Sequence, residues 1–188
     1  PSVNEASFTG QTQEQFFRFH LRPGVFGLSD NGFMQIHIIA VGSRMPEWVQ
    51  AGYAEYARRL PHECRLTLHE IPAGKRTKGA DLARLTRAEG ARQLAAVPPG
   101  SRIVALDRTG RVHDTPALAA RLEKQLAAGG DLAVLIGGPE GLAPEVVQRA
   151  DERWSLSALT LAHPLVRVVL AEQLYRAWSI LRGLPYHR

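Results

Sequence analysis

The chain has 188 residues, of which 45% are hydrophobic, so it can bury the core of one domain of ordinary size. It has no apolar run near the ~20 residues of a membrane span, and its single cysteine, Cys64, excludes an intrachain disulfide and a cysteine metal cluster. The net charge of +5 suits an anionic partner such as nucleic acid, the alternative being a basic protein without such a partner.

Residues 1–33 differ from the rest of the chain. Their first 15 residues are polar and patternless, and residues 1–33 carry more acidic than basic residues. They lack the basic-then-apolar pattern of a secretory signal, which with the lone cysteine favours a cytoplasmic protein. Because Met34 begins a clean strand, we expect residues 1–33 to be a flexible extension, either non-native or upstream of the natural start, and residues 34–188 to form a single domain. The alternative is an interaction arm whose adhesive residues are Phe16, Phe17 and Phe19.

From Met34 onward, predicted strands and helices alternate. Strands are expected at residues 35–41, 65–71, 102–107, 131–136 and 153–156. Helices are expected at residues 46–60, 79–96, 114–128, 144–149 and 164–182. Strands separated by helices predict an α/β fold, with a mostly parallel sheet flanked by helices.

The strand at 102–107 ends in Leu106-Asp107-Arg108-Thr109-Gly110. A leucine at the carboxyl end of a strand can pack against a flat ligand such as adenine, or it can be an ordinary core residue. Asp107 and Thr109 are expected to shape a turn, because both side chains can bond nearby backbone groups.

The strand at 131–136 stops at Gly137-Gly138-Pro139-Glu140-Gly141. Adjacent glycines let the backbone approach a ligand closely, and strand ends are where open α/β sheets bind small molecules. The stretch is neither G-x-G-x-x-G nor a Walker loop, which weighs against NAD chemistry and nucleotide hydrolysis. We therefore expect a small-molecule cradle that is built mostly from backbone groups.

The segment Trp154-Ser-Leu-Ser-Ala-Leu-Thr160 mixes hydroxyl and aliphatic side chains and carries no charge. Its backbone can bond the edge of an adenine, and it does not repel a cationic ligand. S-adenosylmethionine has both properties, whereas the alternative is an ordinary strand and turn.

His163-Pro164 stands at the start of the last predicted helix. The positive helix end disfavours protonation there, so the imidazole is expected to stay neutral and able to accept a proton, unless it serves only as a cap or packing residue. The helix is apolar nearly all round, which predicts a subunit interface. Glu172 is the exception, and it can pair with Arg176 four residues later.

Two other segments suit contact with nucleic acid. Near the chain end, Tyr186 can stack on a base and Arg188 can bind phosphate or a base edge, although termini usually fray. The loop at residues 72–79 suits phosphate contact or plain solvation, and its basic residues are Lys75, Arg76 and Lys78.

These residues together make a specific resemblance. From Met34 to Arg188 the chain resembles the RlmH family, the pseudouridine N3-methyltransferases of bacterial large-subunit ribosomal RNA within the SPOUT class. The matching stretches are Ala40-Val-Gly-Ser-Arg-Met-Pro46, Glu70-Ile-Pro-Ala-Gly-Lys-Arg76, Leu135-Ile-Gly-Gly-Pro-Glu-Gly141, Trp154-Ser-Leu-Ser-Ala-Leu-Thr160, His163-Pro-Leu-Val-Arg167, Ala171-Glu-Gln-Leu-Tyr-Arg-Ala-Trp178 and the terminal Pro-Tyr-His-Arg.

The resemblance implies a sheet whose C-terminal part threads a deep trefoil knot, with S-adenosylmethionine bound in the knot. No metal is expected, because the sulfonium is already a strong electrophile. The cofactor-binding positions that it implies are Leu106, Gly137, Gly138, Gly141, Leu156, Ser157, Ala158, Leu159, Thr160, Leu161 and Ala162.

The resemblance also implies a homodimer with a composite site, in which one subunit holds the cofactor and the other contributes to catalysis or RNA contact. His163, Tyr186 and Arg188 match family positions near the target base. The implied reaction methylates N3 of a pseudouridine in 23S ribosomal RNA on the assembled 70S ribosome. Whether His163 accepts the N3 proton or Arg188 stabilises the anion stays open.

Two other functions compete with this one. The chain could be a SPOUT methyltransferase with another target, such as a tRNA base, or a non-catalytic ribosome-binding factor.

Overall fold

The computed structural model of the chain describes residues 33–187, and side chains as far as Tyr186. The expected upstream extension lies outside this part except for Phe33, and so does Arg188.

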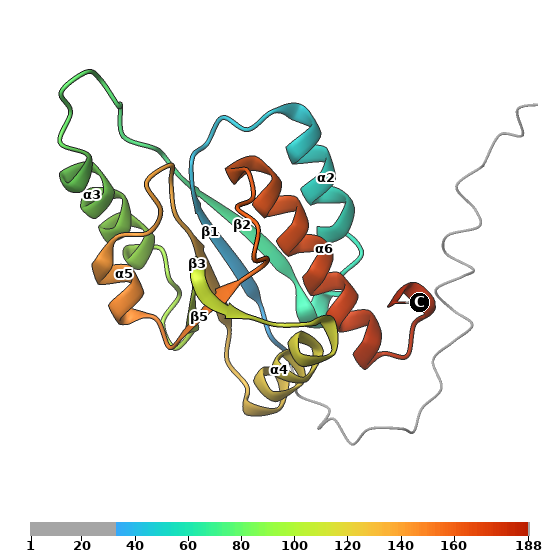
Figure 1. Cartoon of the computed structure of the whole chain (residues 1–188). Coiled ribbons are helices and arrows are strands. Elements are labelled where there is room, and N and C mark those ends of the chain that lie inside the picture. The colour runs from blue at the N-terminus through green and yellow to red at the C-terminus, as the bar shows by residue number, and fades with distance from the viewer. Residues whose placement is uncertain (1–32, 188) are drawn as a thin grey trace, which may run out of the picture. The chain divides into compact units, whose positions relative to one another are not determined.

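Within residues 33–187, strands and helices alternate in the predicted order (Figure 1). The strands are β1 (Ile36–Val41), β2 (Leu66–Ile71), β3 (Arg102–Val112), β4 (Leu132–Ile136) and β5 (Glu152–Ser155). The helices are α2 (Glu47–Ala57), η1 (His62–Cys64), α3 (Leu82–Ala95), α4 (Thr115–Ala128), α5 (Pro144–Arg149), α6 (His163–Leu181) and η2 (Pro185–His187).

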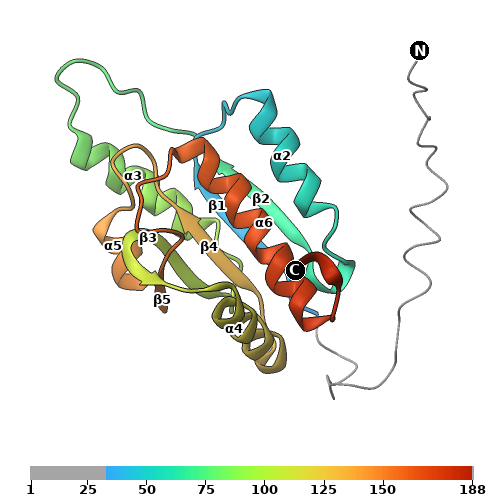
Figure 2. The same cartoon turned by 45° about the vertical axis from the view of Figure 1, so that its right-hand side comes forward.

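The strands form one parallel sheet in the order β2-β1-β4-β3-β5. Helices α2, α4 and α6 cover one face, and α3 and α5 cover the other (Figure 2). β1 and β4 are buried along their whole length, because they lie inside the sheet with helices on both sides. The α/β prediction, with a parallel sheet flanked by helices, is confirmed.

The connections that follow β1 and β4 leave these neighbouring strands toward opposite faces of the sheet. The chain after β1 enters α2, which packs against α6, whereas the chain after β4 enters α5, which packs against α3. Such a divergence opens a crevice at the carboxyl ends of the two strands, where α/β proteins bind ligands. The fold therefore marks this edge of the sheet as the candidate site.

Side-chain caps set the starts of two helices. The carboxylate of Asp81 accepts a hydrogen bond from the backbone N–H of Arg84, so α3 begins at Leu82 and not at residue 79 as predicted. Asp114 accepts from the N–H of Ala117 in the same way and starts α4.

β3 continues to Val112, five residues beyond the predicted end at residue 107. Its pairing with β5 shifts register between Leu106 and Arg111, since both of these residues lie opposite Trp154. The polar stretch between them is therefore a bulge inside one strand, after which the ladder resumes.

Asp107 and Thr109, which were expected to shape a turn at the end of the strand, instead shape this bulge within β3. The Asp107 carboxylate accepts hydrogen bonds from the backbone N–H and the hydroxyl of Thr109, at 2.7 and 2.5 Å. These bonds hold the pKa of the Asp107 carboxyl below its ordinary value. Gly110 lets the bulge approach β5, because a Cβ there would lie 2.5 Å from the carbonyl carbon of Trp154.

Candidate functional site

The strand register places the three predicted cofactor-binding segments in one row. Leu106 of β3 pairs with Ile136 of β4 on one side and with Trp154 of β5 on the other. Ile136 directly precedes the glycine turn, and Trp154 lies two residues before the predicted loop at 156–162. Three segments spread over about 50 residues of the sequence thus meet at the carboxyl edge of the sheet.

The turn after β4 closes on itself through its glycines. The N–H of Gly141 donates to the carbonyl of Gly138 at 2.9 Å, and the φ angle of Gly141 is +86°. A Cβ at Gly137 would lie 2.2 Å from the carbonyl carbon of Gly141. The turn therefore requires glycine at Gly137 for space and favours it at Gly141 for backbone conformation.

Gly138 faces the end of β1 and an ion-pair network. A Cβ at Gly138 would lie 3.1 Å from Val41 Cγ1, 3.1 Å from Arg76 Nη2 and 3.3 Å from Glu89 Oε2. The guanidinium of Arg76 bonds the carboxylates of Glu89 and Glu140. Arg76, expected to suit phosphate contact, is instead engaged within the chain.

The charges in this network stabilise one another. Bonds to Glu140 and Glu89 raise the pKa of Arg76 above its ordinary value, and the bond to Arg76 lowers the pKa of the Glu140 carboxyl. Neither Arg76 nor Glu89 was predicted to belong to the site, because the contacts join residues 13 and 64 positions apart.

The hydroxyls of the predicted cofactor loop shape the loop itself. Ser155 Oγ donates to the carbonyl of Ser157, and Ser157 Oγ accepts from the N–H of Leu159, each at 2.9 Å. Leu156, Ser157 and Leu161 are half-buried, whereas Ala158, Leu159, Thr160 and Ala162 are exposed. Leu159 has 76% of its surface exposed, so it can cover a ligand from the outside.

His163 begins α6 and lies against the end of β1. Its Nε2 is 2.8 Å from the carbonyl oxygen of Val41, so Nε2 carries the proton of the neutral ring and Nδ1 keeps a lone pair. Burial, with the charge of Arg167 nearby, lowers the pKa of His163 below its ordinary value. The neutral imidazole expected from the sequence thus has burial as its main cause.

Arg167, one turn further along α6, is a site residue that was not predicted. Its side chain is 1% exposed, and its guanidinium donates to Glu70 Oε1 at 2.6 Å and to the carbonyl of Gly42 at 2.6 Å. It also donates to the carbonyl of Val41 at 3.1 Å, the oxygen that His163 contacts. An arginine inside an apolar helix four residues after His163 was the signal that could have identified it.

Tyr186 is not near His163 within one chain. Its hydroxyl donates to Glu172 Oε1 at 3.1 Å, and its ring lies under the guanidinium of Arg176, which pairs with Glu172 as predicted. Burial, followed by hydrogen bonding with Tyr56 and by the charge of Glu172, raises the pKa of Tyr186 above its ordinary value. Glu172 lies nine residues after His163 on α6, or roughly 13 Å along the helix axis at 1.5 Å per residue. The structure thus separates these two predicted catalytic residues, and the third, Arg188, lies outside the described residues.

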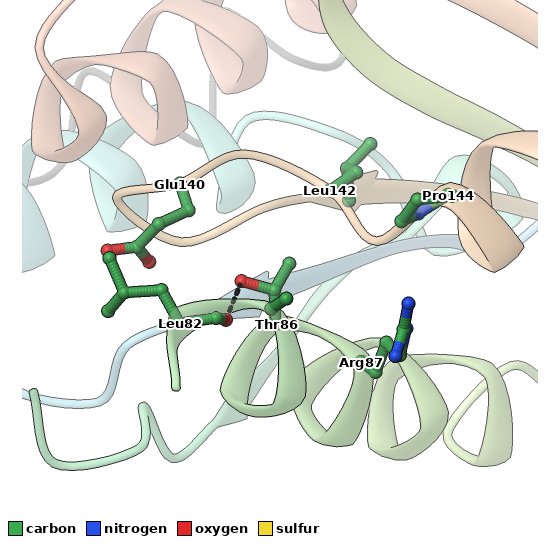
Figure 3. Close-up of a pocket in the computed structure, with 7 residues that line it drawn as sticks. Leu82, Thr86, Arg87, Glu140, Leu142 and Pro144 are labelled. Atoms are coloured by element: carbon green, nitrogen blue, oxygen red, sulfur yellow. Dashed lines mark hydrogen bonds between the residues drawn. The ribbon is translucent and has the colours of Figure 1, made fainter. Parts of the chain in front are cut away.

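A groove of about 320 Å³ lies between α3 and the glycine turn (Figure 3). It is lined by Leu82, Ala83, Thr86, Arg87, Glu140, Leu142 and Pro144, which include none of the predicted cofactor-binding residues. In this groove the hydroxyl of Thr86 donates to the carbonyl of Leu82 at 2.9 Å. The groove therefore flanks the turn on the α3 side.

The part of the chain that the structure describes holds no group of three or more histidine, cysteine, aspartate or glutamate side chains placed to bind a metal ion. Over the same residues, no helix is both long and apolar enough to cross a membrane.

Three half-buried histidines predict a pH-dependent stability. The pKa of His163, and likewise those of His69 and His113, lies below the ordinary value because burial disfavours the charged ring. Below about pH 6.5 the unfolded chain therefore binds protons that the folded chain does not, so the free energy of unfolding falls as the pH is lowered. We expect the Tm to fall between pH 7 and pH 5, and the fall to be smaller in His163→Gln. If the Tm of wild type and of His163→Gln falls equally between pH 7 and pH 5, that would contradict a lowered pKa at His163.

The chain matches known proteins over its described part. A family model described as a predicted SPOUT methyltransferase matches residues 34–187. The chain is 62% identical over 155 residues to the ribosomal RNA large subunit methyltransferase H of Thioalkalivibrio sulfidiphilus (strain HL-EbGR7), covering 82% of this chain and 99% of that relative. A solved structure of a probable methylase family protein from Haemophilus influenzae Rd KW20 matches with a TM-score of 0.49 and 11% identity, over 81% of this chain and 70% of that one.

Proposed function

Because the chain belongs to the SPOUT methyltransferase family, we propose that it methylates N3 of a pseudouridine in 23S ribosomal RNA on the assembled 70S ribosome. The observation that carries the proposal is the row of Leu106, the glycine turn and the loop at 156–162, with the neutral imidazole of His163 at the same sheet edge. The match to a ribosomal RNA large subunit methyltransferase, over nearly its whole length, supports RNA as the substrate. A ribosomal substrate also supports the cytoplasm as the place of action.

The residues at this edge fit S-adenosylmethionine. The loop at 156–162 carries no charged side chain to repel a sulfonium, and the turn presents backbone where a Cβ would not fit. Leu106, Gly137, Gly138, Gly141 and the loop at 156–162 would hold the cofactor. When bound, S-adenosylmethionine supplies an electrophilic methyl group.

His163 is suited to accept the proton that N3 loses. Its Nε2 is occupied by the carbonyl of Val41, so Nδ1 is the basic atom, and the lowered pKa keeps that atom unprotonated at neutral pH. Arg167 holds the carbonyls of Val41 and Gly42 and thereby orients the ring. Arg188 would act on the developing anion by its charge.

The path of the chain supports the implied trefoil knot. β5 is at the sheet edge beyond β3, yet His163, eight residues after β5 ends, contacts Val41 on the far side of β4. The chain therefore crosses back over the ends of β3 and β4 before α6 begins. We include the knot in the proposal.

The separation of His163 from Tyr186 supports a composite site in a homodimer, where the C-terminal residues of one subunit complete the cofactor-holding half of the other. We expect Gly137→Ala and Arg188→Ala each to have little activity alone. When the two variants are mixed in equal amounts and allowed to re-associate, half of the dimers contain one subunit of each kind. Such a dimer has one intact composite site out of two, so activity should return to about a quarter of the wild-type value. Failure of mixtures to regain activity, in subunits shown to exchange, would contradict a site shared between subunits.

Thermal unfolding with S-adenosylhomocysteine separates a catalyst from a non-catalytic ribosome-binding factor. A ligand that binds only the folded enzyme stabilises it by RT ln(1 + [L]/Kd), so the Tm should rise with S-adenosylhomocysteine and not with adenosine diphosphate. An unchanged Tm would favour the ribosome-binding factor. If the Tm rises, methyl transfer to tRNA but not to ribosomes would favour the other rival.

A further inference from the structure

Glu89 is a carboxylate buried under the glycine turn. It lies on α3, its side chain is 2% exposed, and Gly90 beside it packs so closely that a Cβ there would lie 2.6 Å from the Cβ of Ala143. Burying an ionised carboxylate costs free energy, and an apolar residue of similar volume would often stabilise the fold as well or better. Packing alone therefore does not explain why a carboxylate occupies this buried position.

Both oxygens of the Glu89 carboxylate accept hydrogen bonds from the loop after β2, from the backbone of Gly74 and from the side chain of Arg76. Oε1 accepts from the N–H of Gly74 at 2.7 Å and from Arg76 Nη1 at 2.8 Å, and Oε2 accepts from Arg76 Nη2 at 3.0 Å. Arg76 Nη1 also donates to the carbonyl of Gly74 at 2.9 Å. The guanidinium is thus fixed in position and in plane.

Arg76 links the fixed loop after β2 to the glycine turn. Its Nε and Nη2 donate to Glu140 Oε2 at 2.9 and 2.5 Å, so one guanidinium joins a buried carboxylate of α3 to a carboxylate of the turn. Arg76 Nη2 and Glu89 Oε2 also occupy the space beside Gly138, where they limit its movement. Arginine suits this task because its planar fork bonds two carboxylates at once.

A second residue of α3 shows that the same helix braces the crevice. Gln93, one turn after Glu89 and 1% exposed, donates from Nε2 to the carbonyls of Ile39 and Ile136, each at 3.0 Å. Ile136 directly precedes Gly137, and Ile39 lies in β1, so Gln93 ties the two strands that diverge at the site. Polar contacts from α3 thus reach both β4, which leads into the turn, and the neighbouring strand β1.

We propose that Glu89 is a positioning residue for the turn Gly137–Gly141, which it holds in cofactor-binding form through Arg76 and Glu140. The inference rests on the proposed function only in taking this turn to hold S-adenosylmethionine. Glu89 itself touches neither cofactor nor RNA. Its effect should therefore appear in cofactor affinity and in the mobility of the turn, and not in the chemical step.

The test is Glu89→Gln, which keeps the shape of the side chain and removes its charge. We expect the dissociation constant of S-adenosylhomocysteine, measured by titration calorimetry, to rise roughly tenfold, and KM for S-adenosylmethionine to rise with it. KM for ribosomes and kcat should stay within about twofold of wild type. The matched control is Glu145→Gln, which breaks the exposed Arg87–Glu145 pair on the same side of the sheet and should change none of these quantities.

Hydrogen exchange gives a readout that needs no cofactor. The backbone amides of residues 137, 138 and 140–142 should exchange faster in Glu89→Gln than in wild type or in Glu145→Gln. Arg76→Lys keeps the charge but loses the planar guanidinium, so it should show the same faster exchange and weaker cofactor binding. It provides the test if Glu89→Gln does not fold.

Exchange rates and cofactor affinity equal to wild type in a folded variant would overturn the positioning role. If wild type binds no S-adenosylhomocysteine, the proposed function fails, and unchanged exchange in the variants would still refute this inference separately.

Discussion

Gly137→Ala is expected to weaken the binding of S-adenosylhomocysteine by roughly 5- to 150-fold while the chain still folds. The new Cβ would lie 2.2 Å from the carbonyl carbon of Gly141 and 2.5 Å from the N of Leu142. These are backbone atoms of the same turn, so the turn must open to accommodate the methyl group. Overpacking of this kind costs about 1–3 kcal/mol, and each 1.4 kcal/mol that falls on the bound state weakens binding about tenfold.

Gly100→Ala is the matched control for this prediction. Gly100 has a φ of +78°, so alanine there is strained and costs about 1–2 kcal/mol, but its Cβ would meet nothing within 4 Å and lies at the other end of β3. We expect that variant to unfold at a lower temperature and to bind S-adenosylhomocysteine as wild type does. Calorimetric binding by Gly137→Ala that equals the control would show that this turn does not hold the cofactor.

His163→Gln is expected to slow methyl transfer by roughly 10²–10⁴-fold, the usual contribution of a general base. The glutamine amide can still donate to the carbonyl of Val41, but it offers no basic atom in place of Nδ1. Affinity for S-adenosylhomocysteine should therefore change little. The rate is best measured in a single turnover, because product release can otherwise mask the chemical step.

His69→Gln provides the comparison for His163. His69 is also half-buried with a lowered pKa, but it lies in β2 against His37 and has no contact with the turn or with α6 among the described contacts. The single-turnover rate of that variant should stay near the wild-type rate. If His163→Gln also keeps the wild-type rate, His163 is not the proton acceptor, and the electrostatic role of Arg188 becomes the explanation to test.

The sequence predicted most of the fold because its periodic signals are local. The unbroken apolar runs of β1 and β4 indicate buried strands, and Asp114 with the prolines at 98 and 99 indicates where helices begin and end. The continuation of β3 was missed, since Asp107 to Gly110 has the composition of a turn. Only the pairing of Arg111 and Val112 with β5 restores the strand, and that pairing joins distant residues.

The candidate site was predictable only in part. Its glycine turn and uncharged loop carry short motifs, and the strand register brings these motifs together as expected. The bridge from Glu89 through Arg76 to Glu140 has no local signal, because each partner reads as an ordinary exposed charge. The distance between His163 and Tyr186 likewise follows from the docking of η2 on α6, which no spacing in the sequence indicates.

The proposed activity is tested most directly by incubating the full chain with methyl-labelled S-adenosylmethionine and intact ribosomes from cells that lack this modification. Free ribosomal RNA, separated subunits and tRNA serve as parallel substrates. We expect label on N3 of one large-subunit pseudouridine in the intact particle, and little on the other substrates. Label on tRNA alone, or none on any ribosomal substrate by a protein that binds S-adenosylhomocysteine, would contradict the ribosomal assignment.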